Sequence, residues 1–176
     1  VPVNGGKAAQ ITTNAAHDTH PVWSPDGKQI AFASDRMGSM DIFVVDREGG
    51  IPKRLTTHSG NETPVAFKDA DHILFLANVM PSAEDAQFPS GQFQQVYEVS
   101  TTGDRPVMFS SMPMEDISIN KTGNALLYHD KKGYEDPWRK HHTSSITRDI
   151  WLCSLDGKRS YRKLTSFNGE DRTPVW

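Results

Sequence analysis

Histidine and cysteine are the side chains of this sequence best suited to hold a metal ion or to act as a nucleophile. His17 and His20 flank Asp18, His141 and His142 are adjacent, and Cys153 is the single cysteine. A His-Asp-x-His loop can bind zinc, whereas adjacent side chains on an extended strand point to opposite faces and cannot easily share one ion. We expect the histidines to be polar loop residues and Cys153 to be a small buried apolar side chain.

Sequence motifs that mark catalytic sites are missing from the 176 residues. The sequence contains no G-x-S-x-G elbow, phosphate-binding loop, H-E-x-x-H pair or EF-hand loop. One cysteine excludes an intrachain disulfide and a metal site built from several cysteines. We therefore assign no catalytic residue, no metal ligand and no cofactor to this chain.

The charge balance argues against two classes of partner. The chain has 19 Lys and Arg against 22 Asp and Glu, for a net charge of −3. A nucleic-acid-binding domain needs a basic excess to neutralise phosphates, so we expect no nucleic acid. No apolar run approaches the ~20 residues that span a bilayer, so we expect no membrane span. The 13 glycines and 11 prolines favour tight turns and β structure.

A short sequence motif, which we call the recurrent phrase, occurs several times along the chain. It marks the structural elements that must position any site. Pro21-Val22-Trp23 returns as Pro174-Val175-Trp176, Pro64-Val65-Ala66-Phe67 is a third copy, and residues 115–119 are a weaker one with Ile117 in the proline position. The proline positions 21, 64, 117 and 174 are 43, 53 and 57 residues apart. Such a period is the signature of a repeat architecture.

Each repeat contains four short apolar segments separated by turn residues. In the first repeat, Trp23 precedes a Ser-Pro-Asp-Gly-Lys turn and a strand at 29–34, and further strands are expected at 41–45 and 52–56. Four strands in about 45 residues are typical of a β-propeller blade. A β-sandwich would also give short strands, but it would not repeat one phrase at every fourth strand.

The fold class that we predict is all-β, a β-propeller fragment of four-stranded antiparallel blades, with about three full blades and partial blades at both ends. Residues 1–13 would be the last strand of a preceding blade, residues 18–57, 61–110 and 114–166 three blades, and residues 170–176 the start of the next. Because propellers close with four to eight blades, we expect a longer parent chain. We expect the aromatic rings of Trp23, Phe67 and Trp176 to be buried between blades.

The blade sequence resembles that of a known propeller family. Pro21–Lys28, followed by Ile30-Ala31-Phe32, Asp41-Ile42 and Leu55-Thr56, resembles the TolB-type WD-repeat-like blade, and residues 132–151 look like a stretch of the N-terminal propeller of bacterial tricorn-protease homologues. The resemblance implies a parent serine peptidase of the tail-specific type that acts on peptides, with PDZ-like and catalytic domains outside these residues. It places no catalytic residue here.

Two insertions, at about 78–94 and 131–148, both lie between the second and third strands of a blade. The first has two acidic residues and no Lys or Arg, and the second has five basic residues against two acidic ones. Insertions on one face of a repeat protein often mark its binding surface. We therefore expect a peptide-binding or partner-binding face at His58, Asn61, Tyr134, Trp138, Arg139 and Lys140. The alternative is that the insertions pair with each other or dock on a neighbouring domain.

Two functions from different classes remain. In the first, the chain is the non-catalytic propeller region of a tricorn-like serine peptidase and gates, filters or docks peptides or unfolded protein segments for a catalytic domain elsewhere. In the second, it is a TolB-like protein-binding propeller with no attached peptidase. Family resemblance suggests the periplasm, with the cytoplasm as the alternative, and leaves oligomerisation of the parent open.

Overall fold

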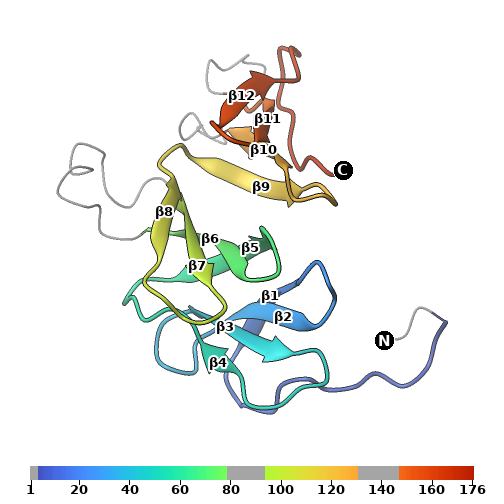
Figure 1. Ribbon diagram of the computed structural model, residues 1–176, viewed down its shortest axis with the longest axis vertical. Helices are drawn as coiled ribbons and strands as arrows, with labels where there is room; N and C mark the ends of the chain where they lie inside the picture. Colours follow the sequence, from blue (N-terminus) through green and yellow to red (C-terminus); the bar gives the residue numbers. More distant parts are fainter. Residues whose placement is uncertain (1–3, 79–93, 131–146) are drawn as a thin grey trace, which may run out of the picture.

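The computed structural model consists of three four-stranded antiparallel sheets that follow one another along the chain (Figure 1). It describes residues 4–78, 94–130 and 147–176. Within each sheet the strands are in sequence order, so each sheet is a simple meander. The first sheet contains β1 (Asp18–Trp23), β2 (Gln29–Ser34), β3 (Asp41–Asp46) and β4 (Lys53–Arg54). The second contains β5 (Glu62–Phe67), β6 (His72–Ala77), β7 (Gln95–Ser100) and β8 (Val107–Ser110). The third contains β9 (Met114–Ile119), β10 (Ala125–Asp130), β11 (Ile150–Ser154) and β12 (Ser160–Lys163).

These sheets confirm the predicted fold class, an all-β, open and partial propeller. The first strands of the sheets, β1, β5 and β9, lie beside one another on the inner side, and β4, β8 and β12 are the outer strands (Figure 1). Residues 4–17 and 164–176 contain no strand, so the placing of the chain ends in flanking blades stays a prediction. No helix in the described part of the chain is long and apolar enough to span a membrane.

The turn after β1 shows how the Ser-Pro-Asp-Gly-Lys sequence of the first repeat folds locally. The Ser24 hydroxyl accepts hydrogen bonds from the backbone N–H groups of Lys28 and Gln29 and donates one to Asp26 at 2.7 Å. That last bond, together with hydrogen bonds from the backbone and side chain of Lys28, lowers the pKa of Asp26 to about 2. Gly27 has a φ of +68°, which a residue without a Cβ adopts at little cost. The turn therefore depends on the Ser, Asp and Gly of the repeat.

A β-bulge interrupts each inner strand at the same position. The pairing shifts between Thr19 and Val22 in β1, between Pro64 and Ala66 in β5, and opposite Leu127 and His129 in β9. A bulge inserts an extra residue into one strand, which bends that strand and increases its twist. Each inner strand is therefore divided into an initial half at one end of the sheet and a final half that carries the recurrent phrase.

The register corrects the predicted alignment of the second repeat. Trp23 pairs with Ile30, and Phe67 takes the same place opposite Ile73, so the two aromatic residues are equivalent. Pro64 then corresponds to His20, one residue before Pro21. The equivalent residues 23, 67 and 119 are 44 and 52 residues apart, whereas the proline positions gave 43 and 53. The sequence contains a signal for this shift, because Asp18-Thr19 and Glu62-Thr63 align without a gap to Trp23 and Phe67.

Apolar side chains fill the two spaces between consecutive sheets. Ile42 and Val44 of the first sheet pack with Ile73 and Phe75 of the second. Leu74 and Val96, on the other face of the second sheet, pack with Leu126 and Tyr128 of the third. Because side chains alternate between the faces of a strand, one sheet can supply both layers. The strands of the middle sheet are accordingly apolar at successive positions.

The free face of the first sheet is closed in a different way. Ile30, Phe32, Phe43 and Val45 form a third cluster, against which Ile11 packs. The Arg36 guanidinium lies 4.6 Å from the ring centroid of Phe43 and 5.3 Å from that of Phe32, and it forms a 2.8 Å ion pair with Asp18. A stacked, paired guanidinium covers aromatic faces without leaving its charge uncompensated.

Candidate functional site

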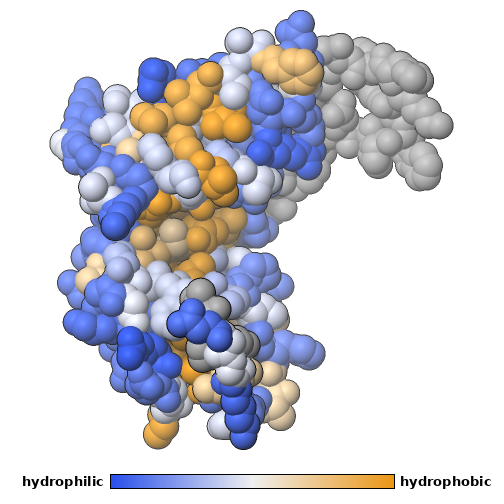
Figure 2. Space-filling view, turned by 90° about the vertical axis from the view of Figure 1, so that its right-hand side faces the viewer, coloured by the Kyte–Doolittle hydropathy of each residue, from blue (hydrophilic) through white to orange (hydrophobic). Residues whose placement is uncertain are grey.

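The three inner strands enclose a hollow of about 420 Å³. It lies where these strands end and where the turns into β2, β6 and β10 begin. Apolar residues gather along the hollowed middle of this face, between its upper and lower parts (Figure 2). The residues that line it are Val22, Trp23, Pro25, Val65, Ala66, Phe67, Lys68, Ile117, Ser118, Ile119, Asn120, Lys121 and Gly123.

Backbone geometry at the bulges positions the side chains of this hollow. His20 and Asp116 occupy equivalent bulge positions and have φ values of 52° and 50°, in the left-handed region that few non-glycine residues adopt. Thr173, before the last copy of the phrase, has a φ of 52° as well. The recurrent phrase follows directly after this turn of the backbone. The same local conformation therefore precedes the recurrent phrase at His20, Asp116 and Thr173, whereas Pro64 takes the equivalent place in β5 without it.

Trp23 is the largest exposed apolar side chain in the hollow. It is 58% exposed, whereas its counterpart Phe67 is 4% exposed in the layer between the first and second sheets. No described sheet lies on the corresponding side of β1, which leaves more than half of Trp23 accessible within the described residues. The expected burial is therefore confirmed for Phe67 and wrong for Trp23. It is also wrong for Trp176, which is 56% exposed and donates its indole N–H to the Ser118 carbonyl at 2.9 Å.

The polar groups of the hollow are suited to binding and not to acyl transfer. Ser118 is its one hydroxyl among the lining residues, and neither a histidine nor a carboxylate lines it. The Lys68 ammonium is held by both carboxylate oxygens of Glu98, at 2.9 and 3.0 Å. Lys121 has no ion pair in the described part of the chain. A ligand in the hollow could thus contact apolar and aromatic side chains and one cation, Lys121, that has no ion pair within the described residues.

Two of the predicted binding-face residues, His58 and Asn61, are described by the structure, and they lie at the end of the inner strands opposite to the hollow. His58 and Asn61 are between β4 and β5, before the inner strand begins. The His58 Nδ1 accepts a hydrogen bond from the Gly60 N–H at 3.0 Å, and the Asn61 side-chain oxygen accepts one from the Met40 N–H at 3.2 Å. Both side chains therefore hold the loop together. Tyr134, Trp138, Arg139 and Lys140 lie outside the described residues, so the binding face stays a prediction.

The histidines considered for metal binding do not converge. The His17 Nδ1 lies 2.9 Å from the Asp35 carboxylate, and the His20 Nδ1 lies 3.1 Å from the Thr19 hydroxyl. Across residues 4–78, 94–130 and 147–176, no three His, Cys, Asp or Glu side chains are grouped so that they could hold a metal ion. Cys153 is fully buried, as expected, and burial raises the pKa of its thiol. His141 and His142 fall outside these ranges.

A buried polar joint between the first and second sheets was missed by the sequence reasoning. Asp41 is fully buried and forms a 2.8 Å ion pair with Arg54. The Thr56 hydroxyl accepts a hydrogen bond from the Ile42 N–H at 2.9 Å and donates one to the Glu62 carboxylate. Burial raises the pKa of Glu62 to about 7; the Thr56 bond opposes this shift and the Asp41 charge adds to it.

The third sheet repeats part of this joint. Asp149 pairs with Lys163 at 2.8 Å, and the Thr165 hydroxyl accepts the Ile150 N–H at 3.0 Å. In the third sheet, Asp171 occupies the position that corresponds to Glu62. The Oδ2 atom of Asp171 is buried without a hydrogen-bond partner. The recurrent Asp-Ile and Leu-Thr pairs of the sequence were the available signal. They show which residues are repeated, but not that these residues meet across a strand and a loop.

An open fan of antiparallel four-stranded sheets around an inner hollow defines a β-propeller region. The chain belongs to the family of the tricorn protease N-terminal β-propeller domain, whose model matches residues 1–176.

Two curated relatives align with nearly the whole chain. Tricorn protease homolog 1 of Streptomyces coelicolor is 24% identical over 175 residues, which cover 99% of this chain and 16% of the relative. A tricorn protease homolog of Saccharolobus solfataricus is 25% identical over 180 residues, which cover 96% of this chain and 15% of the relative. The chain therefore spans about one sixth of the length of these proteins.

Solved structures share the fold. A putative TolB from Agrobacterium tumefaciens superposes with a TM-score of 0.62 at 20% identity, over 98% of this chain and 60% of that one. The tricorn protease superposes with a TM-score of 0.56 at 18% identity, over 85% of this chain and 15% of that one. Both TolB-type and tricorn propellers are thus structural neighbours, as the blade sequence suggested.

Proposed function

We propose that this chain is the non-catalytic propeller region of a tricorn-like serine peptidase, and that it gates, filters or docks peptide substrates for a catalytic domain outside residues 1–176. The observation that carries the proposal is the family match over the whole chain. The structure adds a surface with suitable chemistry, because the hollow is apolar, contains an exposed tryptophan and lacks a histidine and a carboxylate among its lining residues.

The partners that follow from this proposal are peptides or unfolded protein segments and the PDZ-like and serine-peptidase domains of the parent chain. An extended peptide presents apolar side chains and backbone amides, which the walls of the hollow can contact without a deep pocket. Oligomerisation of the parent, and a periplasmic location with the cytoplasm as the alternative, belong to the proposal through the family resemblance alone.

The alternative is a TolB-like protein-binding propeller with no attached peptidase. The superposition on the TolB structure keeps this alternative in view, since it covers 98% of the chain. The fold is common to both functions and does not discriminate between them. The two differ in one measurable property, which is whether the full-length gene product cleaves peptides.

The test compares peptide hydrolysis by the full-length product of the gene and by its Trp23→Ala variant. Aromatic contacts contribute about 1 kcal/mol, so we expect the variant to have a KM several-fold higher for decapeptides and an unchanged KM for a small chromogenic amide. Phe167→Ala is the matched control, because Phe167 is 68% exposed and does not line the hollow.

Three outcomes separate the possibilities. A serine peptidase whose decapeptide KM responds to Trp23→Ala and not to Phe167→Ala supports the proposal. A product that cleaves no peptide contradicts the proposal and favours the TolB-like alternative. Peptide cleavage that is abolished by a single serine substitution within residues 1–176 would show that this region is catalytic.

A further inference from the structure

A second concave surface lies at the outer rim, between the last strands of the second and third sheets. This groove, which we call the β8–β12 groove, has a volume of about 340 Å³. It is lined by Met108, Phe109, Ser110, Ser111, Met112, Arg159 and Tyr161. Among the described strands, β8 pairs only with β7 and β12 only with β11, so the groove runs between two strand edges that no described strand covers (Figure 1). It shares no lining residue with the hollow of the inner strands.

Arg159 is fixed in the groove. Its guanidinium carbon lies 3.8 Å from the ring centroid of Phe109, and its Nη1 donates a hydrogen bond to the Phe109 carbonyl. A guanidinium has five N–H donors in a rigid fork, so these contacts orient the group without using its remaining donors. No carboxylate pairs with Arg159 in the described part of the chain. The groove therefore holds an oriented cation that lacks an anion.

Exposed amphipathic side chains surround this cation. Tyr161 is 40% exposed and Met112 is 41% exposed. The Met112 sulfur accepts a hydrogen bond from the Tyr128 hydroxyl at 3.3 Å, which anchors the side chain at its base. Methionine and tyrosine adapt to apolar ligands at a low entropic cost. Free strand edges also offer unpaired backbone N–H and C=O groups to an extended partner.

The charges of the residues around the groove favour an anionic ligand. Residues 155–163 contain four basic residues and one acidic residue, although the whole chain carries −3. The acidic one, Asp156, accepts a hydrogen bond from Asn124. Residues 107–112, on the other wall, carry no charge. An anionic group beside Arg159 would meet no carboxylate among the residues that line the groove.

We propose that the β8–β12 groove binds an extended peptide segment in which an acidic side chain neighbours an apolar one. The carboxylate pairs with Arg159, the apolar side chain lies against Met112 and Tyr161, and the segment backbone runs along a free strand edge. This inference does not rest on the proposed peptidase function, because it concerns a separate surface and its readout is binding and not cleavage.

The experiment measures binding to the full-length gene product by fluorescence anisotropy. The probe is a labelled, C-terminally amidated Gly-Leu-Asp-Leu-Asp-Leu-Gly peptide, and the same peptide with Asn in place of Asp is the comparison. A hydrogen-bonded ion pair is worth a factor of 10 or more in affinity. We therefore expect at least 10-fold weaker binding of the Asn peptide, and an equal loss for the Asp peptide with Arg159→Gln.

Arg162→Gln is the matched control. Arg162 is an exposed neighbour on β12, but side chains alternate along a strand, so it projects from the face opposite to Tyr161. We expect the affinity of the Arg162→Gln variant for the Asp peptide to differ less than 2-fold from that of the unsubstituted protein. Met112→Asp is a second variant that leaves Arg159 in place and puts a carboxylate in the groove. It should weaken binding of the Asp peptide by a larger factor than binding of the Asn peptide, because the new carboxylate repels only the charged peptide, whereas the loss of the Met112 contact affects both.

Several results would overturn the inference. Equal affinity for the Asp and Asn peptides would show that the carboxylate forms no ion pair with Arg159. Equal losses of affinity from Arg162→Gln and Arg159→Gln would show that the peptide responds to the overall positive charge and not to Arg159. Failure of both peptides to bind would also contradict it. If sedimentation instead shows a dimer that Arg159→Gln dissociates, the groove is an interface between copies of the chain.

Discussion

Thr56 donates its hydroxyl hydrogen to the Glu62 carboxylate and so joins the end of the first sheet to the start of the second. Both side chains are 1% exposed, and Asp41, in the same joint, is fully buried. Two carboxyl groups near one arginine can both be ionised only at a considerable cost in a buried site. The joint is therefore the place where protonation affects the packing of consecutive sheets.

The first prediction is a pH-dependent stability gain in Glu62→Gln. The pKa of Glu62 is about 7 in the folded chain, above its ordinary value of 4.5, so folding favours the protonated carboxyl. This contribution is fully present below pH 4.5 and is lost as the pH rises through 7. We expect the variant to match the unsubstituted chain at pH 4.5 and to be up to about 3 kcal/mol more stable at pH 8.

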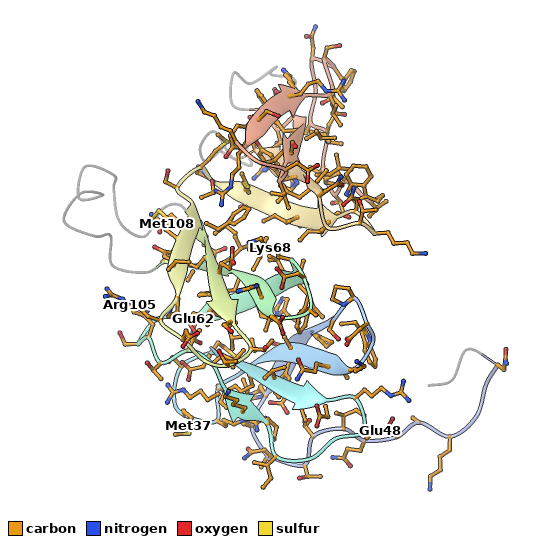
Figure 3. The ribbon with its side chains drawn as sticks, viewed as in Figure 1. Met37, Glu48, Glu62, Lys68, Arg105 and Met108 are labelled. Atoms are coloured by element: carbon orange, nitrogen blue, oxygen red, sulfur yellow. The ribbon has the colours of Figure 1, made fainter. Side chains whose placement is uncertain are left out.

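Chemical denaturation at several pH values measures this effect, with Glu48→Gln as the control. Glu48 lies at the turn between β3 and β4, where its side chain is 79% exposed, whereas Glu62 lies in the joint (Figure 3). The Glu48→Gln variant should differ in stability from the unsubstituted chain by the same amount at pH 4.5 and at pH 8. A Glu62→Gln variant that is less stable than the unsubstituted chain at pH 8 would show that the ionised carboxylate supports the fold.

The second prediction separates the two equivalent aromatic residues of the inner strands. Phe67→Ala should lower the free energy of unfolding by about 3–5 kcal/mol, because the ring is buried between two sheets. Trp23→Ala should lower it by about 1 kcal/mol or less, since more than half of that ring is exposed. Urea denaturation checks both values. Equal losses from the two substitutions would mean that Trp23 is buried in solution.

The third prediction concerns the ion pair beside the hollow. Lys68→Met should destabilise the chain by about 1–2 kcal/mol, because it leaves the half-buried Glu98 carboxylate without its cation. Arg105→Met removes an exposed charge that has no ion pair in the described residues, and it should change stability by less than about 0.5 kcal/mol. Figure 3 shows the two side chains apart from each other, Lys68 in the turn between β5 and β6 and Arg105 in the loop between β7 and β8. Thermal unfolding of both variants compares them, and equal shifts in Tm would contradict a specific role for the pair.

Much of the fold could be predicted from sequence because local chemistry repeats. The Ser-Pro-Asp-Gly-Lys turn specifies its own hydrogen bonds, and the alternation of apolar residues gives the strands. The alignment of β5 on its proline is wrong, because Pro64 occupies the position of His20 and not that of Pro21. The exposure of Trp23 depends on whether another sheet covers this side chain, and the repeat pattern of the sequence does not predict that.

Less of the site could be predicted, because its residues meet only in the folded chain. Nothing in the sequence shows that Asp41 and Glu62, which are 21 residues apart, share one buried joint. Arg159 and Phe109 stack across 50 residues for the same reason. The insertion residues Tyr134 and Trp138 lie outside the described residues, and their role stays a prediction.

The central claim, that this propeller region handles peptides for a catalytic domain elsewhere, is tested most directly by photo-crosslinking during turnover. Benzoylphenylalanine would replace Trp23 in the full-length gene product, and Phe167 in a control, before irradiation with a decapeptide substrate. The account predicts a covalent substrate adduct at position 23 and little at position 167. Peptide cleavage without an adduct at position 23, or with equal adducts at both positions, would contradict it.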